Sequence, residues 1–138
     1  MARILALDYG ERRTGIAVTD PLQLIASGLT TVPTPELLGF LERYFGTEPV
    51  ERIVIGEPRR LDNRPSEVEP AILDFIRRFS QRFPAIPVSR QDERFSSKMA
   101  MSALVQSGLP KMKRRDKAVI DEVSATLILQ SYLSKTHP

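Results

Sequence analysis

The segment Arg3–Asp8 most constrains what this chain can fold into. Its sequence, Ile-Leu-Ala-Leu between a basic and an acidic residue, is a short continuous apolar run. Such a run, followed here by the turn signal Tyr9-Gly10, is typical of a strand that is buried on both faces. A strand of this kind needs packed layers on both sides of its sheet. The segment therefore predicts an α/β domain with Arg3–Asp8 as its central strand.

The rest of the chain predicts further strands and helices around this strand. The short connection after Gly10 favours an antiparallel hairpin. The element order βββαβαβαα indicates one five-stranded mixed sheet with helices on both faces, in a single domain spanning residues 1–138. The expected strands are 14–19, a part of 24–32, 52–56 and 86–91, and the expected helices are 34–46, 66–83, 97–106 and 116–133.

Local signals predict where the first two helices begin and end. Thr34, followed by proline and glutamate, reads as an N-cap hydroxyl, and Gly46 reads as a stop. Ser66 and Glu69 have capping-box spacing, and Pro84 ends the apolar stripe of the second helix.

Composition excludes several kinds of chemistry. The chain has 138 residues, 41% of them hydrophobic and 27% charged, as in ordinary globular domains. It has no cysteine and a single histidine, His137, which argues against disulfides, thiolate zinc sites and Ser-His-Asp or Cys-His catalysis. No apolar run has the length of a signal or membrane-spanning segment, so we expect a cytoplasmic location and no membrane partner.

Asp8 is the sharpest candidate for a functional residue. A carboxylate that adjoins a buried strand costs several kcal/mol unless it is neutralised or coordinated. Asp8 also falls at the carboxyl end of its strand, where α/β sheets bind ligands. The alternative is that it only opens the turn with Tyr9.

Asp92 and Glu93 follow the last expected strand, again at a carboxyl end. Either could serve as a ligand or base. Alternatively, Glu93 pairs on the surface with Arg90 or Arg94.

Asp121 shares a helical stripe with apolar residues, since Ala125, Ile128 and Tyr132 follow it by four, seven and eleven positions. That is an unusual place for a charge, and it suggests a function. The alternatives are that this helix is apolar nearly all round, or that the helix N-terminus stabilises the acid.

Acids that converge on one sheet edge repel one another unless a cation lies between them. Mg²⁺ and Mn²⁺ prefer carboxylate oxygens. In two-metal nucleases such ions activate water and stabilise the leaving oxygen, and neither histidine nor cysteine is required. The pattern is compatible with this chemistry.

Two basic groups flank the acids and are candidates for binding nucleic acid. The first lies in the polar loop 57–65 and the second precedes the last helix, with a local charge of +4 over residues 111–117. Either group could also be a solvated loop. The candidates, with the nearby Arg94, are Arg59, Arg60, Arg64, Arg94, Lys111, Lys113, Arg114, Arg115 and Lys117.

The chain resembles the RuvX family, also called YqgF, over its whole length. The resemblance lies in Leu7-Asp-Tyr-Gly10 with Thr14-Gly-Ile-Ala-Val18, in Ile53-Val-Ile-Gly56 with Pro58, in Asp92-Glu-Arg94 before Ser96-Ser97, and in Asp121 with Ile128-Leu-Gln-Ser-Tyr-Leu133. Members are described as candidate Holliday junction resolvases and as nucleases that mature pre-16S ribosomal RNA. The resemblance implies an RNase H-like fold and an acidic metal site, with the acids at Asp8, Glu93 and Asp121.

One motif departs from the family pattern. Members commonly have leucine before the proline after this strand, where this chain has Glu57, and Asn63 replaces a glycine. Related resolvases carry a metal-binding glutamate near this strand end. Glu57 is therefore a candidate fourth ligand, unless Pro58 turns it outward.

We expect an endonuclease that uses Mg²⁺ or Mn²⁺ to cleave structured nucleic acid, either pre-ribosomal RNA or branched DNA. Asp8, Glu93 and Asp121 are the expected catalytic and metal-binding residues. Ribosomal precursor particles are candidate partners, and a monomer or weak homodimer is expected. The alternatives are a non-catalytic nucleic-acid-binding or ribosome-assembly module and, because Asp8-Tyr-Gly10 resembles a phosphate loop, an ATPase. An ATPase of that type needs two such domains, for which 138 residues are too few.

Overall fold

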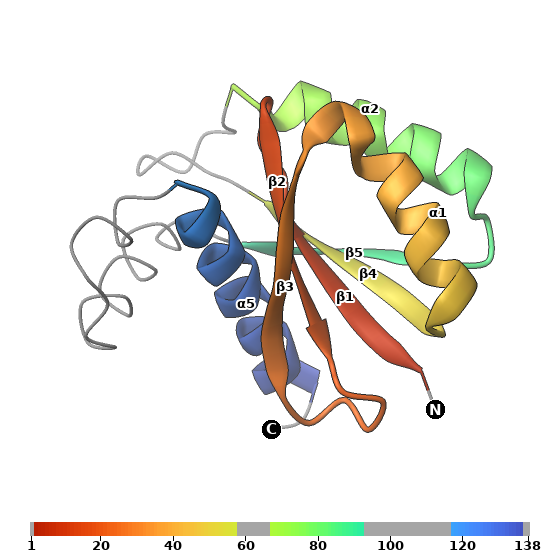
Figure 1. Cartoon of the computed structure of the whole chain (residues 1–138), viewed down its shortest axis with the longest axis vertical. Helices are drawn as coiled ribbons and strands as arrows, with labels where there is room; N and C mark the ends of the chain where they lie inside the picture. Colours follow the sequence, from red (N-terminus) through yellow and green to blue (C-terminus); the bar gives the residue numbers. More distant parts are fainter. Residues whose placement is uncertain (1, 58–66, 93–116, 137–138) are drawn as a thin grey trace.

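The computed structural model of the chain describes residues 2–57, 67–92 and 117–136 (Figure 1). Three strands come first, followed by a 3-10 turn, η1, and then by alternating helices and strands. The elements are β1 (Arg3–Asp8), β2 (Arg13–Thr19), β3 (Ala26–Pro33), η1 (Thr34–Glu36), α1 (Leu37–Thr47), β4 (Val50–Glu57), α2 (Glu69–Arg82), β5 (Val88–Asp92) and α5 (Lys117–Thr136).

The strands form one five-stranded mixed sheet in the order β3-β2-β1-β4-β5. β1 lies at its centre, antiparallel to β2 and parallel to β4. Leu5, Ala6 and Leu7 are fully buried. The prediction of a central strand covered on both faces is therefore confirmed.

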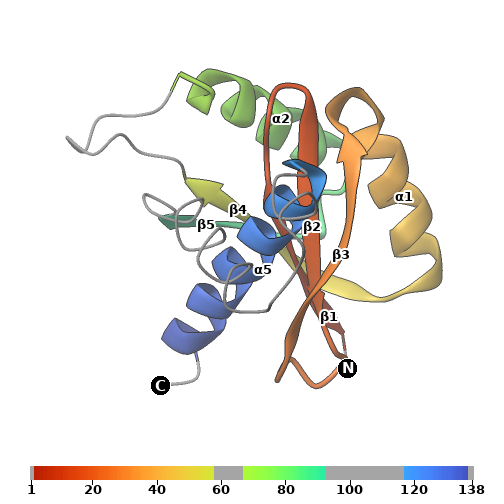
Figure 2. The same cartoon turned by 60° about the vertical axis from the view of Figure 1, so that its left-hand side comes forward.

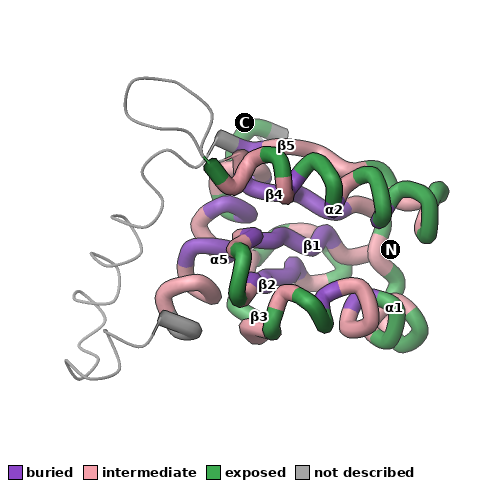
Figure 3. The backbone as a smooth tube through the Cα atoms, turned by 90° about the horizontal axis from the view of Figure 1, so that it is seen from above, coloured by how far each residue is buried: buried purple, intermediate pink, exposed green. Residues whose placement is uncertain are grey.

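Helices cover both faces of this sheet. Figures 1 and 2 show α5 on one side and α1 and α2 on the other. Side chains alternate along β1: Leu5 and Leu7 belong to the core under α1 and α2, whereas Ile4 and Ala6 belong to the core under α5. Figure 3 shows β1 buried within the molecule, with the outer sides of α1 and α2 exposed.

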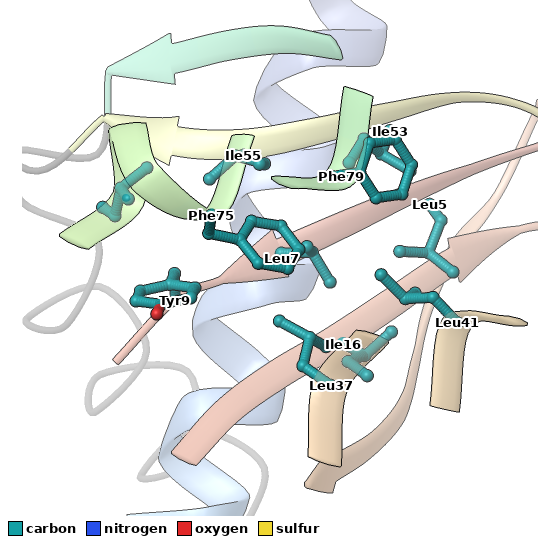
Figure 4. Packing of buried hydrophobic residues seen from close by; sticks show 11 residues of the cluster. Leu5, Leu7, Tyr9, Ile16, Leu37, Leu41, Ile53, Ile55, Phe75 and Phe79 are labelled. Atoms are coloured by element: carbon teal, nitrogen blue, oxygen red, sulfur yellow. The ribbon is translucent and has the colours of Figure 1, made fainter. Parts of the chain in front are cut away.

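Large side chains fill the face under α1 and α2. Phe75 and Phe79 of α2 lie over β1 and β4 (Figure 4). The rings of Phe79 and Phe83 are 5.0 Å apart, and Phe45 from α1 meets Phe83 edge to face at 5.1 Å. Burial of this aromatic and aliphatic surface supplies much of the free energy that holds the domain together.

Small residues line the opposite face, where α5 packs. Ala6 and Ala17 on the sheet meet Ala125 on the helix, with Ile128 and Leu129 further along. A Cβ added to Gly28 would lie 2.8 Å from the Cγ of Glu122. Short side chains thus allow the helix to approach the strands closely.

Two predicted helix caps were wrong because their side chains have tertiary partners. Thr34 begins η1, and its hydroxyl donates to the carbonyl of Gly10 at 2.5 Å instead of capping the helix. Glu69 is the first residue of α2, and its carboxylate accepts from Arg90 instead of completing a capping box.

The remaining boundaries differ from the prediction by a few residues. Gly46 lies inside α1, which ends at Thr47, and β5 extends through Asp92. The predicted helix 97–106 lies outside the described residues. Within the described parts of the chain, no helix combines the length and apolar character needed to cross a membrane.

Candidate active site

Asp8 ends β1 on the face of the sheet that α5 covers. Alternation along the strand gives this face to Ile4, Ala6 and Asp8 in turn, and the first two belong to the core under α5. Asp8 is partly buried, and its Cα partner across the antiparallel ladder is Gly15 of β2. The strand register therefore fixes the position of Asp8 relative to α5.

Gly15 is the point at which α5 meets the strands. A Cβ on this residue would lie 2.1 Å from the carbonyl oxygen of Asp121 and 2.9 Å from the backbone nitrogen of Glu122. These are backbone atoms, so the first turns of α5 can lie here only because residue 15 has no side chain. Since Gly15 is also the cross-strand partner of Asp8, the fold brings Asp8 and Asp121 to one place although they are far apart in sequence.

Asp121 is held from the side by a cation that the sequence analysis missed. The Nε of Arg13 donates to Oδ2 of Asp121 at 2.6 Å, and the two side chains are 35% and 22% exposed. Arg13 is the first residue of β2 and lies two positions before Gly15, so alternation directs both to the α5 face. The two-residue spacing of Arg13 and Gly15 could have been noted in the sequence. The sequence does not indicate, however, that Asp121 is the partner of Arg13.

A pocket of about 450 Å³ lies beside this ion pair. It is bounded by the β1–β2 connection, by the start of α2 and by α5. The lining residues are Gly10, Glu11, Arg12, Arg13, Val68 and Asp121. Two guanidinium groups and two carboxylates thus border a space next to the carboxyl end of the central strand.

A second, smaller pocket of about 250 Å³ lies on the α1 and α2 side of the same connection. Tyr9 and Phe75 form part of its wall, with their ring centroids 5.4 Å apart, and Arg78 and Glu11 also line it. Burial raises the pKa of the Tyr9 hydroxyl, and the charge of Arg78 partly offsets that rise. This phenol therefore stays protonated at neutral pH.

Glu57, the candidate fourth ligand, ends β4 on the other side of the sheet. Ile53 and Ile55 belong to the core under α1 and α2, whereas Val54 belongs to the core under α5. Alternation places Glu57 with Ile55, and extending the register of Leu7 with Ile55 by one residue places Gly56 beside Asp8. Alternation thus places Glu57 and Asp8 on opposite faces of the sheet.

Arg90, one of the surface partners considered for Glu93, has another partner. It donates to both carboxylate oxygens of Glu69, at 2.7 and 3.1 Å. Its guanidinium also donates to the carbonyl of Gly56 at 3.0 Å. Arg90 therefore joins β5, β4 and α2 in a partly buried network.

Two other acids have lowered pKa values for local reasons. Backbone amides of Ile25, Leu24 and Leu22 donate to Asp20 in the β2–β3 connection and lower the pKa of its carboxyl. Hydrogen bonding from Arg77 does the same for Asp74 on α2. Asp20 stabilises the β2–β3 connection, whereas Asp74, which also pairs with Arg78 at 3.1 Å, lies beside the second pocket.

Apart from Lys117, the other predicted site residues lie outside the described residues. Within the described parts of the chain, no group of three or more His, Cys, Asp or Glu residues is arranged to hold a metal ion. Lys117 begins α5, but its side chain is not described. The structure thus places the backbones of Asp8 and Asp121 on either side of Gly15. The predicted residues outside the described ranges are Glu93, Arg59, Arg60, Arg64, Arg94, Lys111, Lys113, Arg114 and Arg115.

The mixed sheet with helices on both faces is an RNase H-like fold. The structure is similar to that of T. thermophilus RuvC, solved in complex with a Holliday junction substrate. The TM-score is 0.58, the sequences are 18% identical, and the match covers 99% of this chain and 98% of that one. At this level of identity the likeness shows a shared fold.

The family is shown by the sequence. The family model described as RuvX, Holliday junction resolvase, matches residues 2–135, so the chain belongs to the RuvX family. A protein of Christiangramia forsetii is 60% identical over 133 residues, covering 96% of this chain and 98% of its own length. A protein of Porphyromonas gingivalis is 57% identical, covering 96% of each chain. Both are named as candidate pre-16S rRNA nucleases.

Proposed function

We propose that this chain is a divalent-metal-dependent endonuclease that hydrolyses phosphodiester bonds in structured nucleic acid. The observation that carries the proposal is the meeting of Asp8 and Asp121 at Gly15, at the carboxyl end of the central strand. Ligand sites of α/β sheets lie at such strand ends. Membership of a family described by nuclease activity supports the same conclusion.

The donor set at this place fits a hard divalent cation. Asp8 and Asp121 offer carboxylate oxygens, which Mg²⁺ and Mn²⁺ prefer over nitrogen or sulfur ligands. We propose Glu93, which directly follows the last residue of β5, as the third ligand. Alternation along β4 argues against Glu57 as a fourth.

Among the described residues, the acids would bind the ion and the arginines would bind the substrate. Asp8 and Asp121 would hold the ion, while Arg12 and Arg13 in the adjoining pocket would bind and orient phosphate groups. When bound, the ion would polarise the phosphate and make water a better nucleophile. The basic residues of 59–64, 94 and 111–117 would extend the contact with the nucleic acid backbone.

The names of close relatives favour precursor 16S ribosomal RNA as the substrate. Curated relatives that match nearly the whole chain at 57% and 60% identity carry that substrate in their names. A DNA junction is the substrate named by the family description and bound in the RuvC structure. A ribosomal precursor particle in the cytoplasm would then be the natural partner.

A metal-dependent cleavage assay that offers both substrates tests this function. Wild-type protein should cut the pre-ribosomal RNA with Mg²⁺ or Mn²⁺ and not in EDTA. Asp8→Asn should keep the fold but lose cleavage by a factor on the order of 10³, because several kcal/mol of transition-state stabilisation depend on the ion. Glu57→Leu is the matched control at another strand end. Its cleavage rate should stay within about twofold of wild type, because alternation places Glu57 on the opposite face of the sheet from Asp8.

Equal cleavage by Asp8→Asn and wild type would contradict the proposal. The ion pair between Arg13 and Asp121 is the observation that favours a second candidate, a non-catalytic nucleic-acid-binding module, because a cation of the protein itself already neutralises one proposed ligand. Tight RNA binding in EDTA, with no cleavage under any divalent metal, would support that candidate.

A further inference from the structure

Arg13 holds Asp121 in a way that bears directly on metal binding. Its Nε lies 2.6 Å from Oδ2 of Asp121, and 108 residues separate the two in the chain. The ion pair is partly exposed and borders the 450 Å³ pocket. Arg13 is therefore placed to interact with Asp121 on one side and with a bound molecule on the other.

A guanidinium group and a divalent ion compete for the same carboxylate. An arginine side chain stays charged at any pH that a protein tolerates, so Arg13 cannot yield its place by losing a proton. Two cations on one partly buried carboxylate repel each other, and this repulsion is much stronger than in bulk water. A metal ion that binds Asp121 is thus opposed by Arg13 for as long as the ion pair stays closed.

The pocket offers Arg13 an alternative partner when substrate is present. Arg13 and Arg12 both line it, next to the carboxylates of Asp121 and Glu11. A phosphodiester that enters this space presents oxygens that a guanidinium can bind through two parallel hydrogen bonds. Movement of Arg13 to a phosphate would relieve the opposition at Asp121 and add a contact to the substrate.

We propose that Arg13 exchanges Asp121 for a substrate phosphate, so that nucleic acid and divalent metal bind cooperatively. The inference rests on the proposed nuclease function and adds to it a coupling between the two ligands. Without nucleic acid, Arg13 keeps the affinity for metal low. With nucleic acid, the same side chain helps to hold the strand at the ligands. By linkage, each ligand raises the affinity for the other by the same factor.

Mn²⁺ titration of the whole chain without nucleic acid tests the competition directly. Arg13→Gln should bind Mn²⁺ on the order of tenfold more tightly than wild type, within the usual range of coupling between sites. Arg12→Gln removes the same charge from the same pocket but leaves the ion pair between Arg13 and Asp121 in place. Its affinity for Mn²⁺ should change by no more than about twofold to threefold, since it alters only the long-range field.

The cooperativity gives a second readout, obtained from KM for RNA as a function of Mn²⁺ concentration. In wild type, rising Mn²⁺ should lower KM, and in Arg13→Gln this dependence should be largely lost. Its kcat/KM at saturating Mn²⁺ should fall by about tenfold or more, as expected for loss of a charge-assisted phosphate contact. Arg12→Gln should keep the dependence on Mn²⁺.

An unchanged or weaker affinity of Arg13→Gln for Mn²⁺, at an unchanged Tm, would overturn the inference, because it would mean that Arg13 orients Asp121 for the metal instead of opposing it. If Arg13→Gln does not fold, Arg13→Met keeps the aliphatic stem without the charge and must show the same tightening. Failure of wild type to bind Mn²⁺ or to cleave RNA under any condition would instead refute the proposed nuclease function.

Discussion

The two faces of the central sheet are built from different kinds of residues. Under α1 and α2, aromatic and branched side chains such as Phe75, Phe79 and Leu41 fill the core. Under α5, the sheet presents the small residues Gly15, Ala6 and Ala17, and the helix packs apolar side chains against them except at its start, where Asp121 and Glu122 lie against the strands. The first face supplies bulk for stability, whereas the second permits the close approach of backbones that brings two acids together.

This difference predicts that mutations on the two faces separate stability from activity. Large side chains can be shortened on the α1 and α2 face at a cost in folding free energy alone. On the α5 face, added atoms should displace α5 and thereby move Asp121 away from Asp8.

The largest effect on stability is expected from Phe79→Ala. Phe79 is fully buried and contacts the rings of Phe45, Phe75 and Phe83. Truncation should lower the free energy of unfolding by about 3–5 kcal/mol, measured by urea denaturation. At a temperature where the variant is folded, its affinity for Mn²⁺ should match wild type.

Leu73→Ala on the same helix is the matched control, because Leu73 is 54% exposed. It should change the free energy of unfolding by less than about 0.5 kcal/mol. A folded Phe79→Ala variant with weakened metal binding would show that the two faces are not separable.

A smaller loss of stability with a larger loss of function is expected from Gly15→Ala. The new Cβ would collide with the carbonyl of Asp121, so α5 must shift, at a cost of about 1–3 kcal/mol in the free energy of unfolding. Cleavage should fall by about 100-fold, as expected when a catalytic group is displaced by about 1 Å. Urea denaturation and the cleavage assay measure the two effects.

Gly46→Ala is the control for this substitution. A Cβ on Gly46 meets nothing within 4 Å, and the residue lies in the last turn of α1. It should leave cleavage unchanged and stabilise the fold by up to about 1 kcal/mol, since alanine favours the helix. Full activity in Gly15→Ala would show that α5 need not lie against β2 at this point.

The smallest effect is expected from Ser124→Ala on the α5 face. The Ser124 hydroxyl is buried and has no hydrogen-bond partner among the described residues. Its removal should raise the free energy of unfolding by about 0.5–1 kcal/mol, because an unpaired buried hydroxyl is costly and alanine favours the helix. Thermal denaturation measures the gain.

Thr126→Val, two residues further along, removes a hydroxyl that does have a partner, the carbonyl of Glu122. It should leave stability unchanged or slightly lower. A loss of stability in Ser124→Ala would contradict this prediction, because it would mean that the hydroxyl has a partner outside the described residues.

The features of the fold that were predictable from sequence are those encoded by a hydrophobic pattern within a few residues. The apolar run of Arg3–Asp8 and the stripe of Ile72, Phe75 and Phe79 each encode burial within a few residues. Their strand and helix are present as predicted, because hydrophobic periodicity directly reflects which face is buried.

The capping predictions failed where a side chain had two possible partners. Thr34 and Glu69 carry the residue types that cap helices, but Gly10 and Arg90 provide tertiary partners for them. A local capping motif gives no information on which distant residues will lie nearby in the fold. Sequence alone therefore could not decide between a helix cap and a tertiary hydrogen bond.

For the candidate site, the sequence singled out Asp8 and Asp121 but not their relation. Gly15 and Arg13 supply that relation, through a backbone contact and an ion pair that join the second strand to the last helix. Nothing in the spacing of residues within either element encodes which partner it will meet. The role of Glu93 stays a prediction.

The arrangement of α5 also has a consequence for the time at which the chain can become active during its synthesis. Because β1 and β2 are made first and Asp121 more than a hundred residues later, a growing chain carries Asp8 long before it carries the partner of Asp8. Nascent chains that lack α5 should therefore be inert toward RNA, including the ribosomal RNA that surrounds them as they emerge. Cleavage would begin only when α5 reaches Gly15, so that synthesis of this helix is a precondition of activity.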